Sequence, residues 1–468
     1  MITTEIKNKL IEIVGASYVF TDDETLNDYG KDHTEDLVFP PSTVVKPAST
    51  QEVSDIMKVA FEYAIPVVPI GARTGLSGGI LAIHKGIGLS LERLNKIEKI
   101  DEQNLQVITQ PGVITEVLQN AVAEKGLMYP VDPSSKGSCF IGGNIAENAG
   151  GARAVKYGVT KDYVLNLEVV LPNGEIIWTG ANTLKNSTGY NLTQLMVGSE
   201  GTLGVVTKIV LKLIPAVQHN VLLWVPFFKM EQAAAAVSAI FRAGIVPSAL
   251  EFMERDAILW TSKFVEVPDV YLKHENEAHL LIEVDGNYPD VLMNEAEKIL
   301  SVVEAYEIDE VLFADTTDQK NTLWKLRRNI AEAVKQNTVY KEEDTVVPRY
   351  ELPKLLIGIK AIGDKYGFKS ICYGHAGDGN LHVNIVKLDM TDELWQTEIP
   401  RGVNEIFQLT KSLNGTISGE HGIGLVQKVF MPIMFNDIEL NLMYQIKKIF
   451  DPKNIMNPGK IFPSTYNH

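Results

Sequence analysis

The chain of 468 residues is longer than a single hydrophobic core usually supports, so two domains are expected. Its 45% hydrophobic and 22% charged residues are typical of a soluble globular protein, and a formal net charge of −16 argues against nucleic-acid binding, which needs a basic face. Cys139 and Cys372 are the only cysteines, too few for an iron–sulfur cluster, which needs about four, or for a disulfide framework.

The N-terminal stretch MITTEIKNKLIEIVG has the pattern of an amphipathic helix, and it lacks the apolar core and cleavage site of a signal peptide. The longest apolar stretch, residues 221–228, is far too short to span a bilayer. We therefore expect a reducing, cytoplasmic setting and no transmembrane segment. Peripheral contact with a membrane is left open.

The first part of the chain alternates short strands with helices. Residues 1–45 are expected to form a helix and then an irregular acidic segment, and Ser49 and Glu52 have the spacing of a capping box that opens the next helix. Strands are expected near 65–70, 88–91 and 105–109, and a further helix over 115–125. This alternation is typical of an α/β or α+β domain.

Residues 130–158 form the longest glycine-rich region of the chain. A β-hairpin with an Asn173-Gly174 turn is expected over 164–178, and a glycine turn leads into a β-branched strand within 198–215. Pro215 marks an expected domain boundary.

Beyond that boundary the pattern predicts a sheet with helices on one face. Strands are expected at 220–226 and 279–284, and helices at 230–243 and 322–334. The last 20 residues are rich in turn formers.

Two polar islands of the second half attract attention as a site. His375 and His382 flank an Asp-Gly turn, so a hairpin brings the imidazoles together and places His382 and Asn384 on one strand face. Glu420 and His421 lie in the second island, SGEHGIG. Two histidines and a carboxylate are a common ligand set for a catalytic divalent metal. A lone histidine is more simply a polar hairpin residue, but three histidines and a glutamate favour a site.

Three glycine clusters, within 71–79, 130–158 and 198–204, predict anion binding, because bare backbone N–H groups cradle phosphate oxygens. The first cluster, GARTGLSGG, does not fit the dinucleotide fingerprint G-x-G-x-x-G, and the chain has no Walker sequence.

Six segments, in this order, resemble the FAD-linked oxidase family: PIGARTGLSGG, DPSSKGSCFIGGNIAENAGG, GSEGTLGVVT, GHAGDGNLHVNI, SGEHGIG and NPGK. The resemblance is strongest to its D-2-hydroxyacid dehydrogenase branch, which includes glycolate oxidase large subunits, FAD-dependent D-lactate dehydrogenases and D-2-hydroxyglutarate dehydrogenases. It implies an α+β, two-domain fold of the vanillyl-alcohol-oxidase type. Residues 1–215 would form the FAD-binding domain, 216–440 an α+β cap domain for substrate and metal, and 441–468 a tail that returns to the FAD-binding domain.

The resemblance also implies that the glycine-rich loops hold FAD. Some relatives attach FAD covalently through a histidine or cysteine of the first loop, and residues 71–79 contain neither, so noncovalent FAD is expected. The implied FAD-binding residues are Pro69, Gly71, Ala72, Arg73, Thr74, Gly75, Leu76, Ser77, Gly78, Asp132, Ser135, Gly142, Gly143, Asn144, Asn148, Gly150, Gly151, Glu200, Gly204, Val205, Val206 and Asn457.

The activity implied by the resemblance is oxidation of a short D-2-hydroxy acid, first D-lactate or glycolate, to the 2-oxo acid. His375, His382 and Glu420 would hold a divalent metal, with zinc expected first and manganese or iron as alternatives. That metal would lower the pKa of the substrate hydroxyl. His421 would accept the proton as general base, and a ligand or orienting role is its alternative.

The substrate carboxylate is assigned, again by resemblance, to Arg327 and Lys341, with Asn384 as a further contact. Relatives specific for a second carboxylate carry a hydroxyl residue four positions after the arginine, where this chain has Ala331, which disfavours 2-hydroxyglutarate. D-2-hydroxyglutarate dehydrogenase, a non-catalytic subunit of a glycolate-oxidising complex and a flavin-free metal-dependent hydrolase remain as alternatives.

The expected partners are the small 2-hydroxy acid and an external electron acceptor, which is a quinone, an electron-transfer flavoprotein or an iron–sulfur subunit. Nucleic acid is not expected, and a homodimer is left open, as is the use of O2.

Overall fold

The structure is a computed structural model that describes residues 2–34, 37–268, 271, 273, 275–314 and 316–466, so the ends of the predicted N-terminal helix and tail and part of the acidic segment lie outside the described residues. The chain forms two compact units. Unit 1 comprises Met1–Gly150, Val159–Ala216 and Glu420–His468, and unit 2 comprises Gly151–Gly158 and Val217–Gly419. The chain therefore returns to unit 1 at Glu420, whereas the sequence prediction placed the return at residue 441.

Unit 1 begins with a small four-stranded sheet in the order β1-β2-β4-β3. The helix α3 (Thr50–Glu62) starts as predicted at Ser49, whose Oγ accepts a hydrogen bond from Glu52 N, while the Glu52 carboxylate accepts one from Ala48 N. Helices α1 and α3 share one core with this sheet. The elements are α1 (Thr4–Val14), β1 (Val19–Phe20), α2 (Asp23–Asp28), β2 (Thr43–Val45), β3 (Val67–Ile70) and β4 (Ile87–Ser90).

Unit 1 also contains a five-stranded antiparallel sheet in the order β5-β6-β10-β8-β9 and a two-stranded sheet of β7 and β11. The predicted hairpin is β8 and β9, and Gly174 takes φ +86° in its turn. The elements are β5 (Ile97–Asp101), β6 (Gln106–Thr109), α4 (Thr115–Ala123), β7 (Leu127–Met128), α5 (Ile141–Glu147), β8 (Val164–Val170), β9 (Ile176–Trp178), α7 (Leu192–Met196), β10 (Val205–Lys212) and β11 (Ile214–Pro215).

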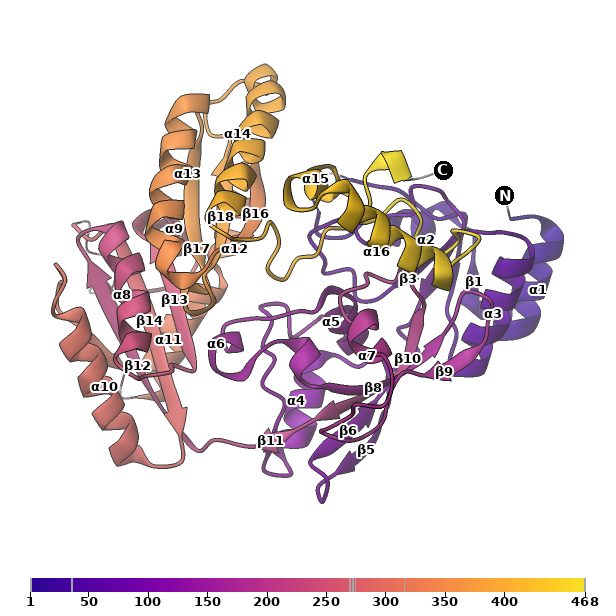
Figure 1. Cartoon of the computed structure of the whole chain (residues 1–468), viewed down its shortest axis with the longest axis horizontal. Helices are drawn as coiled ribbons and strands as arrows, with labels where there is room; N and C mark the ends of the chain where they lie inside the picture. Colours follow the sequence, from indigo (N-terminus) through magenta and orange to yellow (C-terminus); the bar gives the residue numbers. More distant parts are fainter. Residues whose placement is uncertain are drawn as a thin grey trace. The chain divides into compact units, whose positions relative to one another are not determined.

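The C-terminal segment of unit 1 runs through α15 (Met431–Met434) and α16 (Asp437–Phe450), drawn in yellow in Figure 1. After α16 the chain joins the edge of the first sheet, where Met456 bridges Val67 in parallel and Asn457 N donates to Val67 O at 2.8 Å. Residues about 390 positions apart in the sequence are thus neighbours, and the tail is tied to the strand that precedes the first glycine loop.

Unit 2 is built on a seven-stranded sheet, antiparallel throughout, in the order β15-β12-β14-β13-β17-β18-β16. The strands are β12 (His219–Phe227), β13 (Ala249–Glu254), β14 (Ala278–Gly286), β15 (Leu312–Ala314), β16 (Tyr340–Val346), β17 (Lys369–Gly374) and β18 (Asn380–Val386).

Helices cover both faces of this sheet, which corrects the prediction of helices on one face only. One layer contains α8 (Met230–Arg242), α10 (Pro289–Val303), α13 (Leu352–Tyr366) and α14 (Asp392–Ser412). Within this layer α10 contacts α8, α8 contacts α13, and α13 contacts α14 (Figure 1). The other contains α9 (Arg255–Thr261), α11 (Thr317–Arg328) and α12 (Ile330–Asn337). We call the two sides the α13 face and the α9 face.

The predicted helix over 322–334 is two helices, because the chain breaks at Asn329, which closes α11. Apolar residues of both helices share a core with Trp224, Met253 and Tyr373 of the sheet. Arg327, near the end of α11, is buried. No helix in the described ranges is long and apolar enough to cross a membrane.

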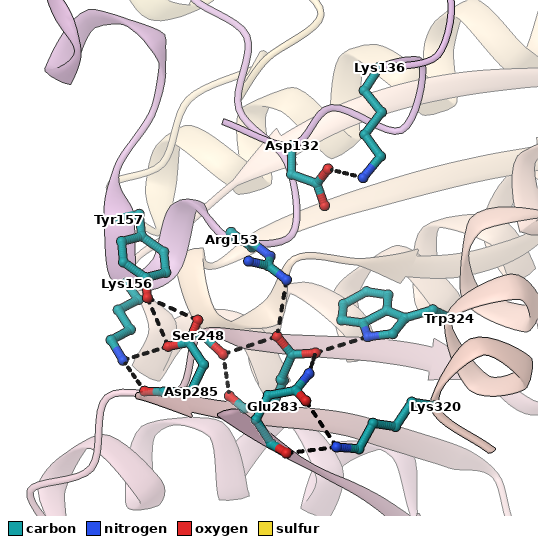
Figure 2. A network of polar contacts seen from close by, with 11 residues as sticks. Asp132, Lys136, Arg153, Lys156, Tyr157, Ser248, Glu283, Asp285, Lys320 and Trp324 are labelled. Atoms are coloured by element: carbon teal, nitrogen blue, oxygen red, sulfur yellow. Dashed lines mark hydrogen bonds and ion pairs between the residues drawn. The ribbon is translucent and has the colours of Figure 1, made fainter. Parts of the chain in front are cut away.

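Residues 151–158 join unit 2 through a polar network on β14 (Figure 2). Lys156 Nζ donates to Asp285 Oδ1 at 2.7 Å, and the Tyr157 hydroxyl donates to the same oxygen at 2.8 Å. Arg153 pairs with Glu283, whose carboxylate also accepts from Trp324 Nε1. These bonds explain why a short piece of the glycine-rich region folds with unit 2.

Candidate active site

The predicted histidine hairpin is present in unit 2, formed by β17 and β18. Tyr373 is paired with His382 in the ladder, and Gly379 closes the turn at φ +77°. A side chain on Gly379 would collide with the carbonyl oxygen of Val347, so this close approach requires glycine. The rings of His375 and His382 lie 5.5 Å apart between centroids, and both residues are buried.

His375 is held by a carboxylate that arrives from another strand. Its Nδ1 lies 2.9 Å from both carboxylate oxygens of Glu251 in β13, and Glu251 is completely buried. A carboxylate beside Nδ1 favours the tautomer with the proton on Nδ1, which leaves the lone pair on Nε2.

Glu251 has a second cationic partner, Arg327, at the end of α11. Arg327 Nη2 lies 2.7 Å from Glu251 Oε2, and the guanidinium carbon lies 5.0 Å from the centroid of the Tyr373 ring. Burial alone would raise the pKa of Glu251, but the charges of His375 and Arg327 outweigh it and hold that pKa below its usual value. Glu251 is therefore an ionised carboxylate in the protein interior, shielded from solvent.

His382 faces two further acids from the edge strand β16. Its Nδ1 lies 3.4 Å from Glu342 Oε1 and 3.8 Å from Asp344 Oδ1. The Tyr373 hydroxyl, whose pKa is raised by burial, donates to Glu342 Oε1 at 3.3 Å. The two histidines thus have separate carboxylate neighbours, as histidines that ligate metals commonly do.

Asp344 anchors the segment that leads into Glu420 and His421. Its carboxylate accepts hydrogen bonds from Asn380 Nδ2 at 2.6 Å and from Gly419 N at 2.8 Å. Gly419 is the last residue of unit 2. The hydrogen bond to Asp344 fixes the backbone of Gly419 beside β16. Glu420 is the next residue, and consecutive Cα atoms are about 3.8 Å apart.

The strand register separates the two predicted substrate contacts on β16 and β18, Lys341 and Asn384. Asn384 is paired with Glu342, so it shares the α9 face with His382, whereas Lys341 is paired with Ile385 and belongs to the α13 face. Lys341 Nζ lies 3.6 Å from Glu343 Oε1. The clamp of Arg327 with Lys341 stays a prediction, and the register places Glu342 rather than Lys341 on the strand face of His382 and Asn384.

Sequence reasoning missed three acids of this site: Glu251, Glu342 and Asp344. Glu251 lies between the apolar residues Leu250 and Phe252 of β13, and Glu342 and Asp344 lie in the strand β16. A carboxylate inside a buried strand is costly unless it is paired, and that cost was the available signal. The partners could not be read, because they come from elements up to 124 residues away.

The donor set fits a divalent metal. His375 and His382 offer ring nitrogens from a rigid hairpin, His375 Nδ1 is already bonded to Glu251, and nitrogen donors with a carboxylate suit zinc, manganese or iron. Both imidazoles are buried, and the buried Glu251 and Asp344 lie on the same face of the sheet. Two neighbouring imidazoles with a carboxylate are a common ligand set for a divalent metal.

In unit 1 the first glycine loop follows β3 and fits an anionic cofactor. Within the described part of the chain, no backbone N–H of residues 71–79 donates a hydrogen bond, and the buried Ser77 Oγ has no partner. Arg73 and Gly78 take positive φ angles of +64° and +73°, a conformation that occurs in backbone anion-binding nests. Phosphate oxygens would satisfy these donors, so the loop fits the pyrophosphate of FAD.

Asn457 of the tail closes on this loop. Its Nδ2 donates to the carbonyl oxygens of Gly79 and Glu200, both at 2.9 Å. The Glu200 carboxylate accepts from Ile423 N and Gly424 N at 2.7 Å, and burial raises its pKa to about 7. Asn457 thus contacts the first glycine loop and Glu200, and Glu200 contacts the segment that follows His421, all within unit 1.

The remaining predicted FAD contacts are placed as follows. Gly142 and Gly143 lie in α5, where a Cβ on Gly143 would meet only open space, and the buried Asn144 donates to Thr115 Oγ1 at 2.7 Å. Asn148 ends α5 in the left-handed conformation. Asp132 pairs with Lys136 (Figure 2), Gly151 belongs to unit 2, and Val205 and Val206 start β10.

Two family descriptions match the chain. Residues 41–180 match the FAD binding domain, and residues 216–461 match the C-terminal domain of FAD linked oxidases. The second match covers more than half of the chain. Its start agrees with the passage from unit 1 to unit 2.

Similar proteins span the whole chain. A D-lactate dehydrogenase of Anaerostipes hadrus is 39% identical, covering 98% of each chain. The glycolate oxidase subunit GlcD of Bacillus subtilis is 38% identical, covering 99% of this chain and 97% of that protein. A D-2-hydroxyglutarate dehydrogenase of Stutzerimonas stutzeri is 35% identical, covering 97% and 98%.

Solved structures share the fold at low identity. P-cresol methylhydroxylase superposes with a TM-score of 0.82 at 17% identity, covering 98% of this chain and 97% of that one. The 4-ethylphenol oxidase of Gulosibacter chungangensis gives 0.74 at 18% identity, with 98% and 97% coverage. The fold is thus the predicted α+β fold of vanillyl-alcohol-oxidase type. The chain belongs to the FAD-linked oxidases and is an FAD-dependent oxidoreductase of their D-2-hydroxyacid dehydrogenase branch.

Proposed function

We propose that the chain oxidises a short D-2-hydroxy acid, D-lactate or glycolate, to the 2-oxo acid. The observation that carries this is a set of buried polar groups with spare hydrogen-bonding capacity on the α9 face. Arg327 Nε has no hydrogen-bond partner in the described chain, and neither amide atom of Asn384 makes a hydrogen bond of ordinary geometry there. The nearby Tyr373 hydroxyl donates to Glu342 instead. Unpaired buried groups are costly, so an anionic, hydroxylated ligand is their natural complement.

The proposed metal ligands are His375 and His382 through Nε2, with Glu420 as the carboxylate. Glu251 beside His375 Nδ1 and Glu342 beside His382 Nδ1 support Nε2 as the ligating atom of both. When bound, the divalent metal supplies a Lewis acid that lowers the pKa of the substrate hydroxyl. Zinc is the first choice for this donor set, and manganese and iron also suit it.

His421 is the proposed general base. His421 follows Glu420 directly in the sequence, so its imidazole would lie next to a metal ligand and could accept the hydroxyl proton. Arg327 binds the substrate carboxylate and thereby fixes which face of the α-carbon is presented. FAD, when bound, accepts the hydride from that carbon.

Electrons then pass to a separate acceptor, for which we propose a quinone, an electron-transfer flavoprotein or an iron–sulfur subunit. Both cysteines of the chain are buried, and burial raises the pKa of Cys372 to about 12. A cytoplasmic location, with any membrane contact peripheral, goes with this proposal.

Substrate size separates the main proposal from its alternative. Ala331 offers no hydroxyl for a second carboxylate, and it is exposed on α12 rather than aligned with Arg327 on one helix. A relative named D-2-hydroxyglutarate dehydrogenase at 35% identity nevertheless keeps that substrate as the second candidate. A relative named as a glycolate oxidase subunit supports a role within a larger complex.

The test is a substrate panel with an artificial electron acceptor, comparing glycolate with the D and L forms of lactate and 2-hydroxyglutarate. We expect activity on D-lactate or glycolate, loss of activity after chelation and its return with added metal. Flavin should appear in the supernatant after acid precipitation, as noncovalent FAD requires. A clear preference for D-2-hydroxyglutarate would overturn the size argument, and flavin retained in the precipitate would overturn noncovalent binding.

A further inference from the structure

Glu251 touches two residues that the proposed function places in different roles. His375 is a proposed metal ligand, and Arg327 is the proposed carboxylate anchor. The Glu251 carboxylate lies 2.9 Å from His375 Nδ1 and 2.7 Å from Arg327 Nη2. One fully buried side chain therefore holds both.

The contact with His375 determines how that ring can act. Because the carboxylate can only accept, His375 donates from Nδ1, and its Nε2 keeps the lone pair that a metal needs. The ring is held by both carboxylate oxygens and cannot flip without leaving an ionised group unpaired in the interior.

The contact with Arg327 determines where its remaining donors point. Nη2 of Arg327 pairs with Glu251, and the guanidinium carbon lies 5.0 Å from the centroid of the Tyr373 ring. These two contacts orient the guanidinium group. Nε has no partner in the described chain. Its donor capacity is available to an anion only in this orientation.

We infer that Glu251 is a positioning residue that joins the metal shell and the substrate carboxylate anchor into one rigid unit, so that metal affinity and hydroxy-acid affinity depend on the same side chain. This inference rests on the proposed function. It goes beyond that function by assigning a role to Glu251, which the proposed function leaves without one.

The same strand offers a matched control. Glu254, three residues on, is also a buried carboxylate paired with a cation, Lys360, but it points to the α13 face. Its Oε2 also accepts from Cys372 N at 3.0 Å. Losing Glu254 removes a buried charge from β13 without touching His375 or Arg327.

The experiment compares wild type, Glu251→Gln, Glu251→Asp and Glu254→Gln as full-length flavoproteins. The apoprotein, freed of metal by chelation, is titrated with Zn²⁺ alone, and KM and kcat for D-lactate and glycolate are measured at saturating metal. For Glu251→Gln we expect metal affinity to fall roughly 10–100-fold and KM to rise, with FAD content unchanged. Glu251→Asp should restore part of both, and Glu254→Gln should change neither.

A fall in metal affinity with an unchanged KM would overturn the joint role, because Glu251 would then serve His375 alone. Equal losses in Glu254→Gln would overturn it as well, since any buried carboxylate of β13 would then be equivalent. If Glu251→Gln does not fold, Glu251→Asp decides, and wild-type affinities in that variant overturn the inference. Failure of the proposed function looks different, because wild type itself would then bind no Zn²⁺ or oxidise no hydroxy acid.

Discussion

The two faces of the unit 2 sheet carry buried carboxylates that are alike in chemistry and differ in completeness. Glu254 on the α13 face is bonded to Lys360 and Cys372 N, and Lys360 Nζ also donates to Ser370 O at 2.8 Å. Glu251 on the α9 face is bonded to His375 and Arg327, yet Arg327 Nε keeps no partner in the described residues. Both carboxylates lie on one strand of six residues.

The difference separates structural from functional charge pairs. A charge pair whose hydrogen-bonding groups are all satisfied within the protein stabilises the fold and needs no ligand. A pair that leaves donors aimed inward is retained against its desolvation cost because a ligand completes it. We therefore interpret the charge pair on the α13 face as structural and the one on the α9 face as functional. Single substitutions on the α13 face should change stability, and those on the α9 face should change activity.

The largest kinetic effect should follow His421→Ala. Glu420 and His421 continue the segment that Asp344 fixes on the α9 face through Gly419. If His421 is the base, the variant keeps metal and FAD and slows flavin reduction roughly 10²–10⁴-fold. Elemental analysis combined with stopped-flow flavin reduction measures both. Metal loss in this variant would make His421 a ligand, and near-normal reduction would remove it from the mechanism.

Breaking the pair on the α13 face should instead cost stability. Lys360→Met leaves the Glu254 carboxylate buried without its cation, and we expect a loss of about 3 kcal/mol in the free energy of unfolding, at the low end for a buried pair because the Lys360 side chain is 29% exposed. Urea unfolding gives the loss. The values of kcat and KM for the folded fraction should match wild type, and a changed KM would erase the contrast between the faces.

Arg327→Lys tests the open donors of the α9 face. A lysine keeps the charge but cannot reach Glu251 and the substrate with one planar fork. One lost charge-assisted contact costs about 1.5–3 kcal/mol, so kcat/KM for the 2-hydroxy acid should fall roughly tenfold to a hundredfold. Steady-state kinetics with an artificial acceptor measures this. Wild-type efficiency on every hydroxy acid would remove Arg327 from the anchor.

The sequence alone predicted the glycine loops and the hairpin because their signals are local. Asp-Gly with flanking strand residues specifies the turn between His375 and His382, and Ser49 with Glu52 specifies the start of α3. The break at Asn329, the strand face of Lys341 and the Glu251 pair depend on packing between distant segments. Register was the critical unknown, since a slip of one residue exchanges Lys341 for Glu342 at the site.

A buried histidine on the α9 face, His279, whose Nδ1 has no hydrogen-bond partner among the described residues, should mark the limit of the contrast. His279 of β14 is 2% exposed and stacks on Trp224 with ring centroids 4.6 Å apart, and burial lowers its pKa to about 3. The unfolded chain, with a histidine pKa near 6.5, takes up this proton first as the pH falls, so the neutral ring contributes stability that is complete above about pH 6.5 and is lost toward pH 3. At pH 5 the loss amounts to about 2 kcal/mol, from about 1.5 pH units at about 1.36 kcal/mol each.

His279→Phe keeps an aromatic ring against Trp224 and removes the titration. Urea unfolding of wild type and variant at pH 7.5 and pH 5.0 isolates the proton, because every other group titrates alike in both. The variant should therefore lose about 2 kcal/mol less than wild type between the two pH values. Parallel losses would mean that His279 is protonated in the folded protein, and burial on this face would then not by itself keep an imidazole neutral.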